Sequence, residues 1–147
     1  MARNFSTGSK RDSAKGKPAL SKLMWKALEE VARVHEYGDD HYGQGNWRKG
    51  QPFSEASNSM LRHWNKLFNY GEDYDEDWID EEGNLRKGSG LLHAAHMAWN
   101  ALFILHMQLH PEYYTKCDDR MDAFGEWVNK VFANSDIAKK LEKGENG

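Results

Sequence analysis

The chain has 147 residues, of which 39% are apolar and 12% aromatic, and its formal net charge at pH 7 is −3. This composition predicts one compact domain, and the near-neutral charge argues against a nucleic-acid-binding protein. Cys117 is the only cysteine, which excludes an intramolecular disulfide and a zinc site built on cysteines. No signal-like hydrophobic core and no membrane-spanning run is present, so we expect a cytoplasmic protein.

Residues 1–19 show no hydrophobic periodicity and are rich in Gly, Ser and Lys, which predicts a flexible arm. The arm is part of a basic stretch, since residues 1–26 carry seven Lys and Arg residues against one acid, Asp12. Lys and Arg donate charge-assisted hydrogen bonds to phosphate oxygens. Arg11 and Lys17 are therefore candidate binding residues for an anionic ligand, although such residues also occur on any solvated surface.

Apolar residues then recur at helical spacing from Leu20 to Val34, which predicts a first helix that Ser21 caps and Gly38 ends. Residues 39–52 hold three glycines and a proline and should form an ordered loop. Tyr42 and Trp47 are the aromatic residues of this loop. They could anchor it by burial or stack on the ring of a ligand.

A second amphipathic helix is predicted from Phe53 to the glycine at position 71, with Ser54 as its cap. It leads into an acidic stretch, because residues 72–82 contain eight carboxylates. Most of these acids are expected to be solvent-facing charge. An acidic loop beside a basic arm also suits a polyanionic ligand held through divalent cations.

A third helix is predicted from Ser89 to His110, where Pro111 stops it. Its residues are apolar on nearly every side, which is typical of the central helix of a bundle. A fourth helix is expected from about 112 to 132, followed by a short one that Ser135 caps. No β alternation is visible, so the prediction is an all-α bundle of four to five helices, with an arm at 1–19, the domain at 20–134 and a short helix and tail at 135–147.

Three polar side chains interrupt the apolar third helix on one stripe. At about 100° per residue, His93, His96 and Asn100 fall within roughly 60° of one another. Buried polar groups must be paired, so these residues are either satisfied by neighbouring helices or presented as ligands and general bases in the interior. Two histidines alone do not identify a metal.

The first two helices offer further candidates. His63 borders the apolar face of the second helix beside Arg62 and could point into the interior, or it could extend to water. In the first helix Glu30 borders the apolar face, while His35 lies inside that face and competes with it as the interior residue.

Carboxylates that directly follow the second helix could face the histidine stripe. Glu72 and Asp75 would then supply hard oxygen ligands for Mg²⁺ or Mn²⁺. No Walker loop, dinucleotide-binding glycine pattern, nucleophile elbow or HExxH motif is present. Nucleophilic catalysis therefore has no obvious agent in this sequence.

In order along about residues 10–108, the chain resembles the phage-type dATP/dGTP diphosphohydrolase (MazZ-type) family, a relative of the MazG nucleotide pyrophosphohydrolases. Each matching element is short, and the ordered series is more specific than any single one. The matching residues are Lys10-Arg11-Asp12, Gly16-Lys17-Pro18, the run from Ala27 to Val34, Gly38, Tyr42-Gly43, Asn46-Trp47, Gly50, Arg62-His63, Gly71-Glu72, Ser89-Gly90, His93, His96 and Asn100.

This resemblance implies a helical bundle that hydrolyses dATP or dGTP to the monophosphate and pyrophosphate with Mg²⁺ or Mn²⁺, in phage nucleotide-pool control within the host cytoplasm. It implies catalytic roles for Glu30, His63, His96 and Asn100, and metal binding by Glu72, Asp75, His93 and His96. The substrate-binding candidates are Arg11, Lys17, Tyr42, Trp47 and Arg62. A homo-oligomer is expected by analogy.

Two departures from the related patterns leave alternatives open. The MazG signature pairs acids as ExxE and ExxD, whereas Arg33 follows Glu30 and no acid accompanies the two histidines. The chain also inserts residues 76–87 before Ser89, so the matching acid is Asp75 or Asp80. An HD-like phosphohydrolase or a non-enzymatic phage accessory protein is the alternative, although the adjacent His-Asp pair of the former is missing.

Overall fold

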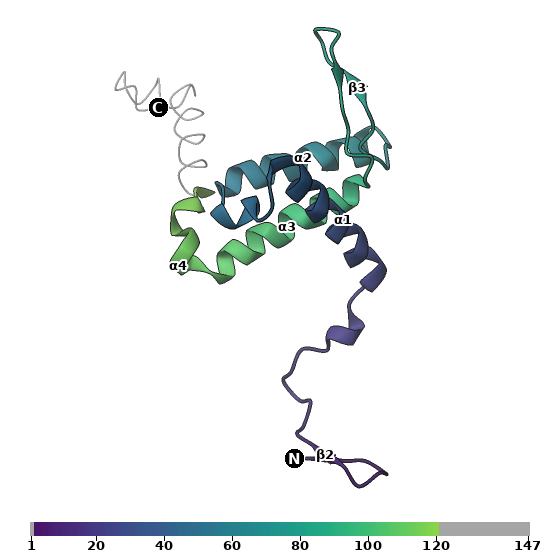
Figure 1. Cartoon of the computed structure of the whole chain (residues 1–147), viewed down its shortest axis with the longest axis vertical. Coiled ribbons are helices and arrows are strands. Elements are labelled where there is room, and N and C mark those ends of the chain that lie inside the picture. The colour runs from purple at the N-terminus through teal and green to yellow at the C-terminus, as the bar shows by residue number, and fades with distance from the viewer. Residues whose placement is uncertain (1, 121–147) are drawn as a thin grey trace, which may run out of the picture.

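The fold is helical, as predicted, in a computed structural model that describes residues 2–120 (Figure 1). The long helices are α1 (Trp25–Tyr42), α2 (Phe53–Asn69) and α3 (His93–Leu109), and α4 (Pro111–Tyr114) is a single turn. Short 3₁₀ helices cover Leu20–Lys22, Asn46–Lys49 and Thr115–Cys117. No helix among these residues is long and apolar enough to cross a membrane.

The third helix is the central one, because α3 packs against α1, α2 and α4. Its inward face contributes Phe103 and Met107 to a core that Phe53, Ala56 and Tyr114 complete. Met107 is almost fully buried, and Trp47 and Trp99 pack against the cluster from its edge. This core holds the C-terminal half of α3 between the other helices, so the histidines in its first turn are set on a supported helix.

The first helix is displaced from the predicted boundaries. Ser21 does not cap it, since α1 begins at Trp25 after Met24 without a side-chain cap. Gly38 lies inside the helix, which continues to Tyr42, because glycine lowers helix stability by only about 1 kcal/mol and does not break the hydrogen-bond ladder. Gly43 ends it instead, with a φ of 95° that other residues rarely adopt.

The second helix begins with an unexpected cap. Ser54 was predicted to cap α2, but it lies inside the first turn, and both its backbone N–H and its hydroxyl donate to the Asp119 carboxylate. A carboxylate at a helix N-terminus satisfies free N–H groups and complements the helix dipole. The chain after Cys117 is thereby held against the start of α2.

This contact explains why the predicted fourth helix is interrupted. Between residues 111 and 119 only α4 and the 3₁₀ turn Thr115–Cys117 are helical. Asp118 has a ψ of 88°, which is outside the helical range, and the chain turns there toward α2. The rest of the predicted helix, from 121 to 132, and the helix capped by Ser135 lie outside the described residues.

Two small antiparallel hairpins were not expected from the sequence. β1 (Arg3–Asn4) pairs with β2 (Lys10–Arg11) in the arm, and β3 (Trp78–Ile79) pairs with β4 (Leu85–Arg86) in the acidic stretch. Two-residue strands are too short for the alternation that identifies strands in a sequence. Both hairpins lie away from the bundle, one toward each end of the longest axis of the chain (Figure 1).

Candidate active site

The acidic stretch returns to the first turn of α3 before and after its hairpin. Asp75 donates its backbone N–H to the Leu91 carbonyl at 2.8 Å and accepts the Gly90 N–H at 2.8 Å, and the His93 N–H donates to the Asp73 carbonyl at 2.9 Å. A side chain at position 88 could not fit, because a Cβ there would lie 2.2 Å from the Asp75 carbonyl oxygen. The root of the β3–β4 hairpin is therefore closed, and it fixes Asp75 beside α3.

Ser89 forms hydrogen bonds with both Asp75 and His96, two residues that were predicted to face each other. The Ser89 backbone N–H and hydroxyl both lie 2.9 Å from Asp75 Oδ2, and Ser89 Oγ lies 2.7 Å from His96 Nε2. The Asp75 carboxylate and His96 Nε2 are 4.0 Å apart. Ser89 thus orients both the carboxylate and the imidazole.

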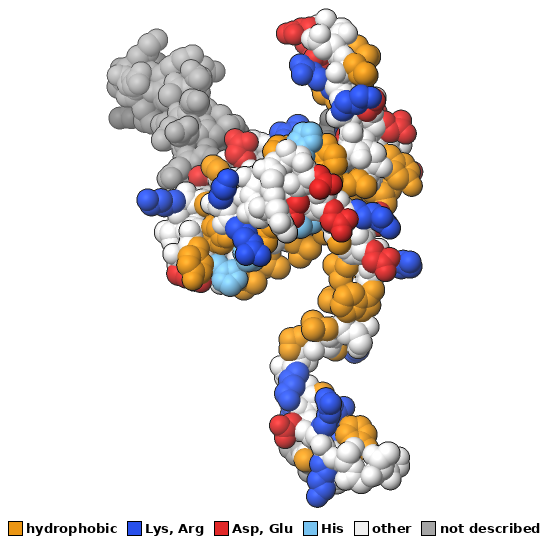
Figure 2. Space-filling view, in the orientation of Figure 1, with side chains coloured by type: hydrophobic (Ala, Val, Ile, Leu, Met, Phe, Trp, Pro, Cys, Tyr) orange, Lys and Arg blue, Asp and Glu red, His pale blue; other side chains and the backbone are white. Residues whose placement is uncertain are grey.

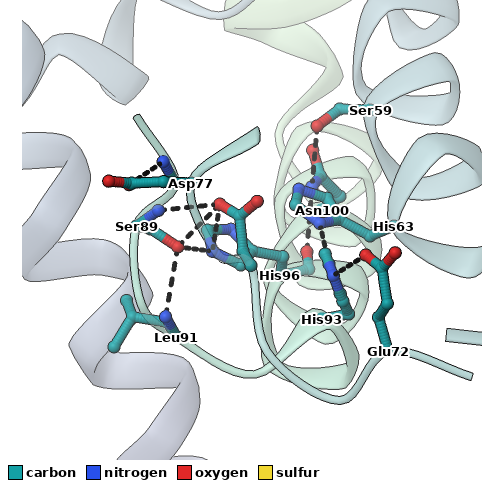
Figure 3. A network of polar contacts seen from close by, with 11 residues as sticks. Ser59, His63, Glu72, Asp77, Ser89, Leu91, His93, His96 and Asn100 are labelled. Carbon is teal, nitrogen blue, oxygen red and sulfur yellow. Dashed lines mark hydrogen bonds and ion pairs between the residues drawn. The ribbon is translucent and has the colours of Figure 1, made fainter. Parts of the chain in front are cut away.

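A second set of polar groups lies against this one. The His63 ring, from α2, stacks on His96 with centroids 4.3 Å apart and planes only 5° from parallel. His63 Nδ1 is 2.8 Å from His93 Nδ1, and His93 Nε2 is 4.0 Å from Glu72 Oε2 (Figure 3). His93 Nε2 is buried and has no hydrogen-bond partner, which is uncommon for a buried polar atom.

The short His63–His93 contact couples the roles of the two rings. One Nδ1 must donate and the other accept, because two neutral imidazoles share a single proton across this bond. If His63 donates, its Nε2 can accept a proton and His93 Nε2 carries an N–H that faces Glu72. If His93 donates, its Nε2 offers a lone pair to a metal ion and His63 becomes a donor.

Asn100, the third residue of the predicted stripe, has a supporting role. Its buried amide donates to the His96 carbonyl at 2.8 Å and lies 3.4 Å from Ser59 Oγ on α2. These contacts satisfy the amide and tie α3 to α2 one turn beyond His96. The explanation by satisfied core contacts therefore fits Asn100 better than it fits the histidines.

The two central imidazoles are held neutral at pH 7. Burial, followed by the neighbouring His96, lowers the pKa of His63 to about 4. Burial also lowers the pKa of His96, while the Asp75 carboxylate opposes this shift. Neutral imidazoles can accept protons or bind metal ions, as protonated ones cannot.

A cleft of about 530 Å³ opens onto this cluster between α1, α2 and α3. His63, His96, Asp75 and Asn100 line its inner part, and Arg62 lies beside them. Its lining includes further groups that can contact a ring or form hydrogen bonds: Tyr37, Asp39, Tyr42, Asn46, Trp47, Gln51, Glu55 and Trp99. The volume is in the range of small-molecule sites.

Of Glu30 and His35, the two candidate interior residues of the first helix, the structure places His35 at the cleft. His35 accepts a hydrogen bond from Trp99 Nε1 at 3.1 Å and lines the cleft. Glu30 lies on the outer side of α1, 3.3 Å from Arg33, and is not brought to the histidine cluster. The catalytic role predicted for Glu30 gains no geometric support from this position.

The structure also separates the two alternative acids, Asp75 and Asp80. Asp80 lies in the turn of the β3–β4 hairpin, where it binds Asn84 and Arg86, and bonds to these groups lower its carboxyl pKa. Asp75, by contrast, lies at the cluster. Arg11 and Lys17 are in the arm and do not line the cleft of their own chain.

Sequence reasoning missed the residues that connect the predicted ones. Ser89 matched the family pattern but was not assigned to the site, and Ser59 and Tyr37 were not singled out. Asp39 follows His35 by one helical turn, 3.7 Å from it, and this spacing was the available signal. The Ser89 contacts depend on the closed hairpin root, for which the sequence offers no periodic signal.

The described side chains do not form a complete metal site by themselves, so an ion bound here would need further ligands. No three His, Cys, Asp or Glu side chains within 2–120 converge on one point. Two pairs are nevertheless available, Asp75 with His96 and Glu72 with the partnerless Nε2 of His93. Mg²⁺ commonly binds through one or two carboxylates together with substrate phosphates and water.

The chain is similar in sequence to known proteins of one family. The family model of the dATP/dGTP diphosphohydrolase N-terminal domain matches residues 7–120. A protein of Salmonella phage PMBT28 named dATP/dGTP diphosphohydrolase is 35% identical over 98 residues, which are 67% of this chain and 29% of that relative. The chain thus spans less than a third of the relative's length. No solved structure matches it.

Proposed function

The chain belongs to the family of dATP/dGTP diphosphohydrolase N-terminal domains, and we propose that it hydrolyses dATP or dGTP to the monophosphate and pyrophosphate. The observation that carries this proposal is the cluster at the end of the cleft. Asp75 and His96 are oriented by one serine, and the His96 ring stacks on the neutral His63. Imidazole and carboxylate groups at the end of an aromatic cleft suit a nucleotide whose phosphates face the cluster.

The proposed step is the attack of a water molecule on the α–β phosphoanhydride. The water oxygen bonds to one phosphorus, the bridging oxygen leaves with the other phosphate, and a cluster histidine accepts the proton of the water. His63 suits this role when it donates its Nδ1 proton to His93, since its Nε2 then carries a lone pair. Asn100 maintains the position of His96, and Arg62 supplies a positive charge for the phosphates.

The base would occupy the outer part of the cleft. Trp47 is half-buried there, edge-on to His35 with centroids 5.5 Å apart, and Tyr42 is exposed at the end of α1. Aromatic rings of this kind contact a nucleobase by stacking or by their edges. The proposal assigns Trp47 to the inner edge of the base and Tyr42 to its solvent side.

We further propose that Mg²⁺ or Mn²⁺ accompanies the triphosphate, held by Asp75 and His96 with Glu72 nearby. Such an ion would neutralise phosphate charge and lower the pKa of the attacking water. His93 is the fourth predicted ligand, and it can take that role only in the tautomer that makes His63 a donor. The relationship to MazG enzymes and the role in phage nucleotide pools in a host cytoplasm remain predictions.

The test is product analysis with purified protein, dATP or dGTP, and Mg²⁺ or Mn²⁺. We expect stoichiometric monophosphate and pyrophosphate, and a loss of about 10³-fold in kcat for His96→Ala, which removes one oriented group of the cluster. His110→Ala is the matched control, because His110 lies at the far end of α3. Release of inorganic triphosphate would instead support an HD-like hydrolase, and equal turnover by wild type and His96→Ala would refute the proposed site.

A further inference from the structure

The basic arm is structurally separate from the bundle that carries the cleft. Backbone hydrogen bonds of residues 3–17 stay within the arm, as in Phe5 to Ser9 and Lys17 to Ala14. The β1–β2 hairpin and the residues after it form a hollow of about 520 Å³, lined by Arg3, Lys10, Arg11 and Lys17 among others. Lys and Arg side chains gather on this projecting arm (Figure 2).

The cleft lacks the cations that a triphosphate requires. Among the described residues that line it, Arg62 is the single Lys or Arg, whereas Asp39, Glu55 and Asp75 are acids. A dNTP carries about four negative charges, and one divalent ion in the cleft would only offset the excess of acids over Arg62 in its lining, so most of the triphosphate charge stays uncompensated.

The missing charge is present in the arm. Residues 1–19 hold five basic residues and one acid, a net charge of +4, and the whole chain has −3, which leaves −7 for residues 20–147. Two copies of the chain are therefore complementary, arm to bundle. Such complementarity favours association and orients the partners.

The segment between the arm and the bundle exposes apolar side chains to solvent. Leu20, Leu23, Met24 and Trp25 form an apolar neck in which each side chain is between 47% and 77% exposed. The outer face of α3 is apolar as well, since Leu102, Leu105 and Leu109 lie at helical spacing and are 45%, 47% and 67% exposed. Contiguous apolar patches of this kind mark interaction surfaces.

Folding back of the arm onto its own cleft would leave this neck uncovered, whereas contact with another copy would bury it. We propose that the arm works in trans: its neck packs on the apolar surface of a second copy, and Arg11 and Lys17 complete the phosphate-binding end of that copy's cleft. The site would then be made by two chains. This inference rests on the proposed function, because the ligand it completes is the triphosphate.

Complementation between two defective full-length variants tests the arrangement. One variant is Arg11→Ala/Lys17→Ala, which removes two charge-assisted phosphate bonds and should lose about 100-fold in kcat/KM. The other is His96→Ala, which keeps the arm intact. Co-expressed in equal amounts and purified together through one shared tag, the mixture should recover hydrolysis, because one mutant supplies intact clefts and the other supplies intact arms.

The expected yield is specific. With random assembly, half of the clefts are intact and half of those receive an intact arm, so about a quarter of wild-type activity per chain is restored. The control co-expresses wild type with a chain that carries all three substitutions. In this mixture an arm that works in trans likewise leaves about a quarter of the wild-type activity per chain, whereas an arm that works in cis leaves about half. Lys22→Ala/Lys26→Ala is the charge-matched control outside the arm hollow and should retain activity.

Several outcomes would overturn the proposal. Active wild type with no recovery in the co-expressed mixture would show an arm that works in cis or a purely monomeric site. Arm substitutions that weaken salt-dependent binding of an oligonucleotide while dGTP hydrolysis is unchanged would assign the arm to nucleic acid. Failure of the wild-type protein to hydrolyse any dNTP would instead refute the proposed function, so the two failures are distinguishable.

Discussion

Asp75 and Asp80 lie in one acidic run, yet the structure places them in different regions. Asp75 is at the closed root of the hairpin, where Ser89 binds its carboxylate and His96 lies 4.0 Å away. Asp80 is in the projecting turn, where its carboxylate accepts hydrogen bonds from Asn84 and Arg86. The Arg86 side chain is 56% exposed. The comparison teaches that a charge run identifies a loop, and that contacts across the chain decide which of its acids reaches the site.

The largest expected effect on this contrast comes from a pair of glycine substitutions. Gly88→Ala would force a Cβ to 2.2 Å from the Asp75 carbonyl and open the hairpin root, which should destabilise the fold by about 1–3 kcal/mol and reduce dGTP turnover. Gly83→Ala, at the turn with a φ of 81°, has open space around it and strains only the hairpin. Melting curves and turnover of both variants measure the difference.

Equal turnover by the two glycine variants would break the comparison. It would mean that the position of Asp75 does not depend on the closed root. A drop in melting temperature alone, without loss of activity at a temperature where both variants are folded, would lead to the same conclusion.

Ser89→Ala should have an intermediate effect, because it removes the hydroxyl between Asp75 and His96 but leaves the backbone N–H bond to Asp75. We expect kcat to fall by about 10- to 30-fold with little change in KM, since one hydrogen bond to a charged group is worth roughly 1.5–3 kcal/mol, of which part is retained. Ser89→Thr restores the hydroxyl and should recover part of the loss. A Thr variant as slow as the Ala variant would argue against an orienting hydroxyl.

The smallest effect concerns stability against pH. His63 has a lowered pKa of about 4 when folded and an ordinary one near 6.5 when unfolded, so the unfolded chain binds more protons between these values. The free energy of unfolding should therefore fall as pH decreases from 7 toward 4. We expect Tm to decrease by a few degrees over this range. His63→Gln should flatten this dependence, and an unchanged slope in that variant would contradict the buried neutral imidazole.

Much of the helical framework was predictable, because α2 and α3 have apolar residues at helical spacing and a core such as Phe103 and Met107 follows from that pattern. The histidine stripe was predictable for the same reason. Helix ends were less so, since Ser54 binds Asp119 from a distant part of the chain rather than capping α2 alone.

The hairpin root shows why the remainder of the site was not predictable. The Asp75–Ser89 contact joins residues on either side of an insertion, and neither periodicity nor spacing encodes which acid returns to α3. The position of the arm was equally beyond sequence patterns. Its basic charge suggested a phosphate ligand, but charge alone does not say whose cleft it serves.

The most direct measurement compares Asp75→Asn with Asp80→Asn in the hydrolysis of dGTP with Mn²⁺. Both variants remove one carboxylate charge from the same acidic run and retain the size of the side chain. We predict that Asp75→Asn loses about 10²- to 10³-fold in kcat, because it removes the carboxylate beside His96, while Asp80→Asn stays within about twofold of wild type. Equal activity of the two variants, or a larger loss for Asp80→Asn, would contradict the assignment of the site to the hairpin root.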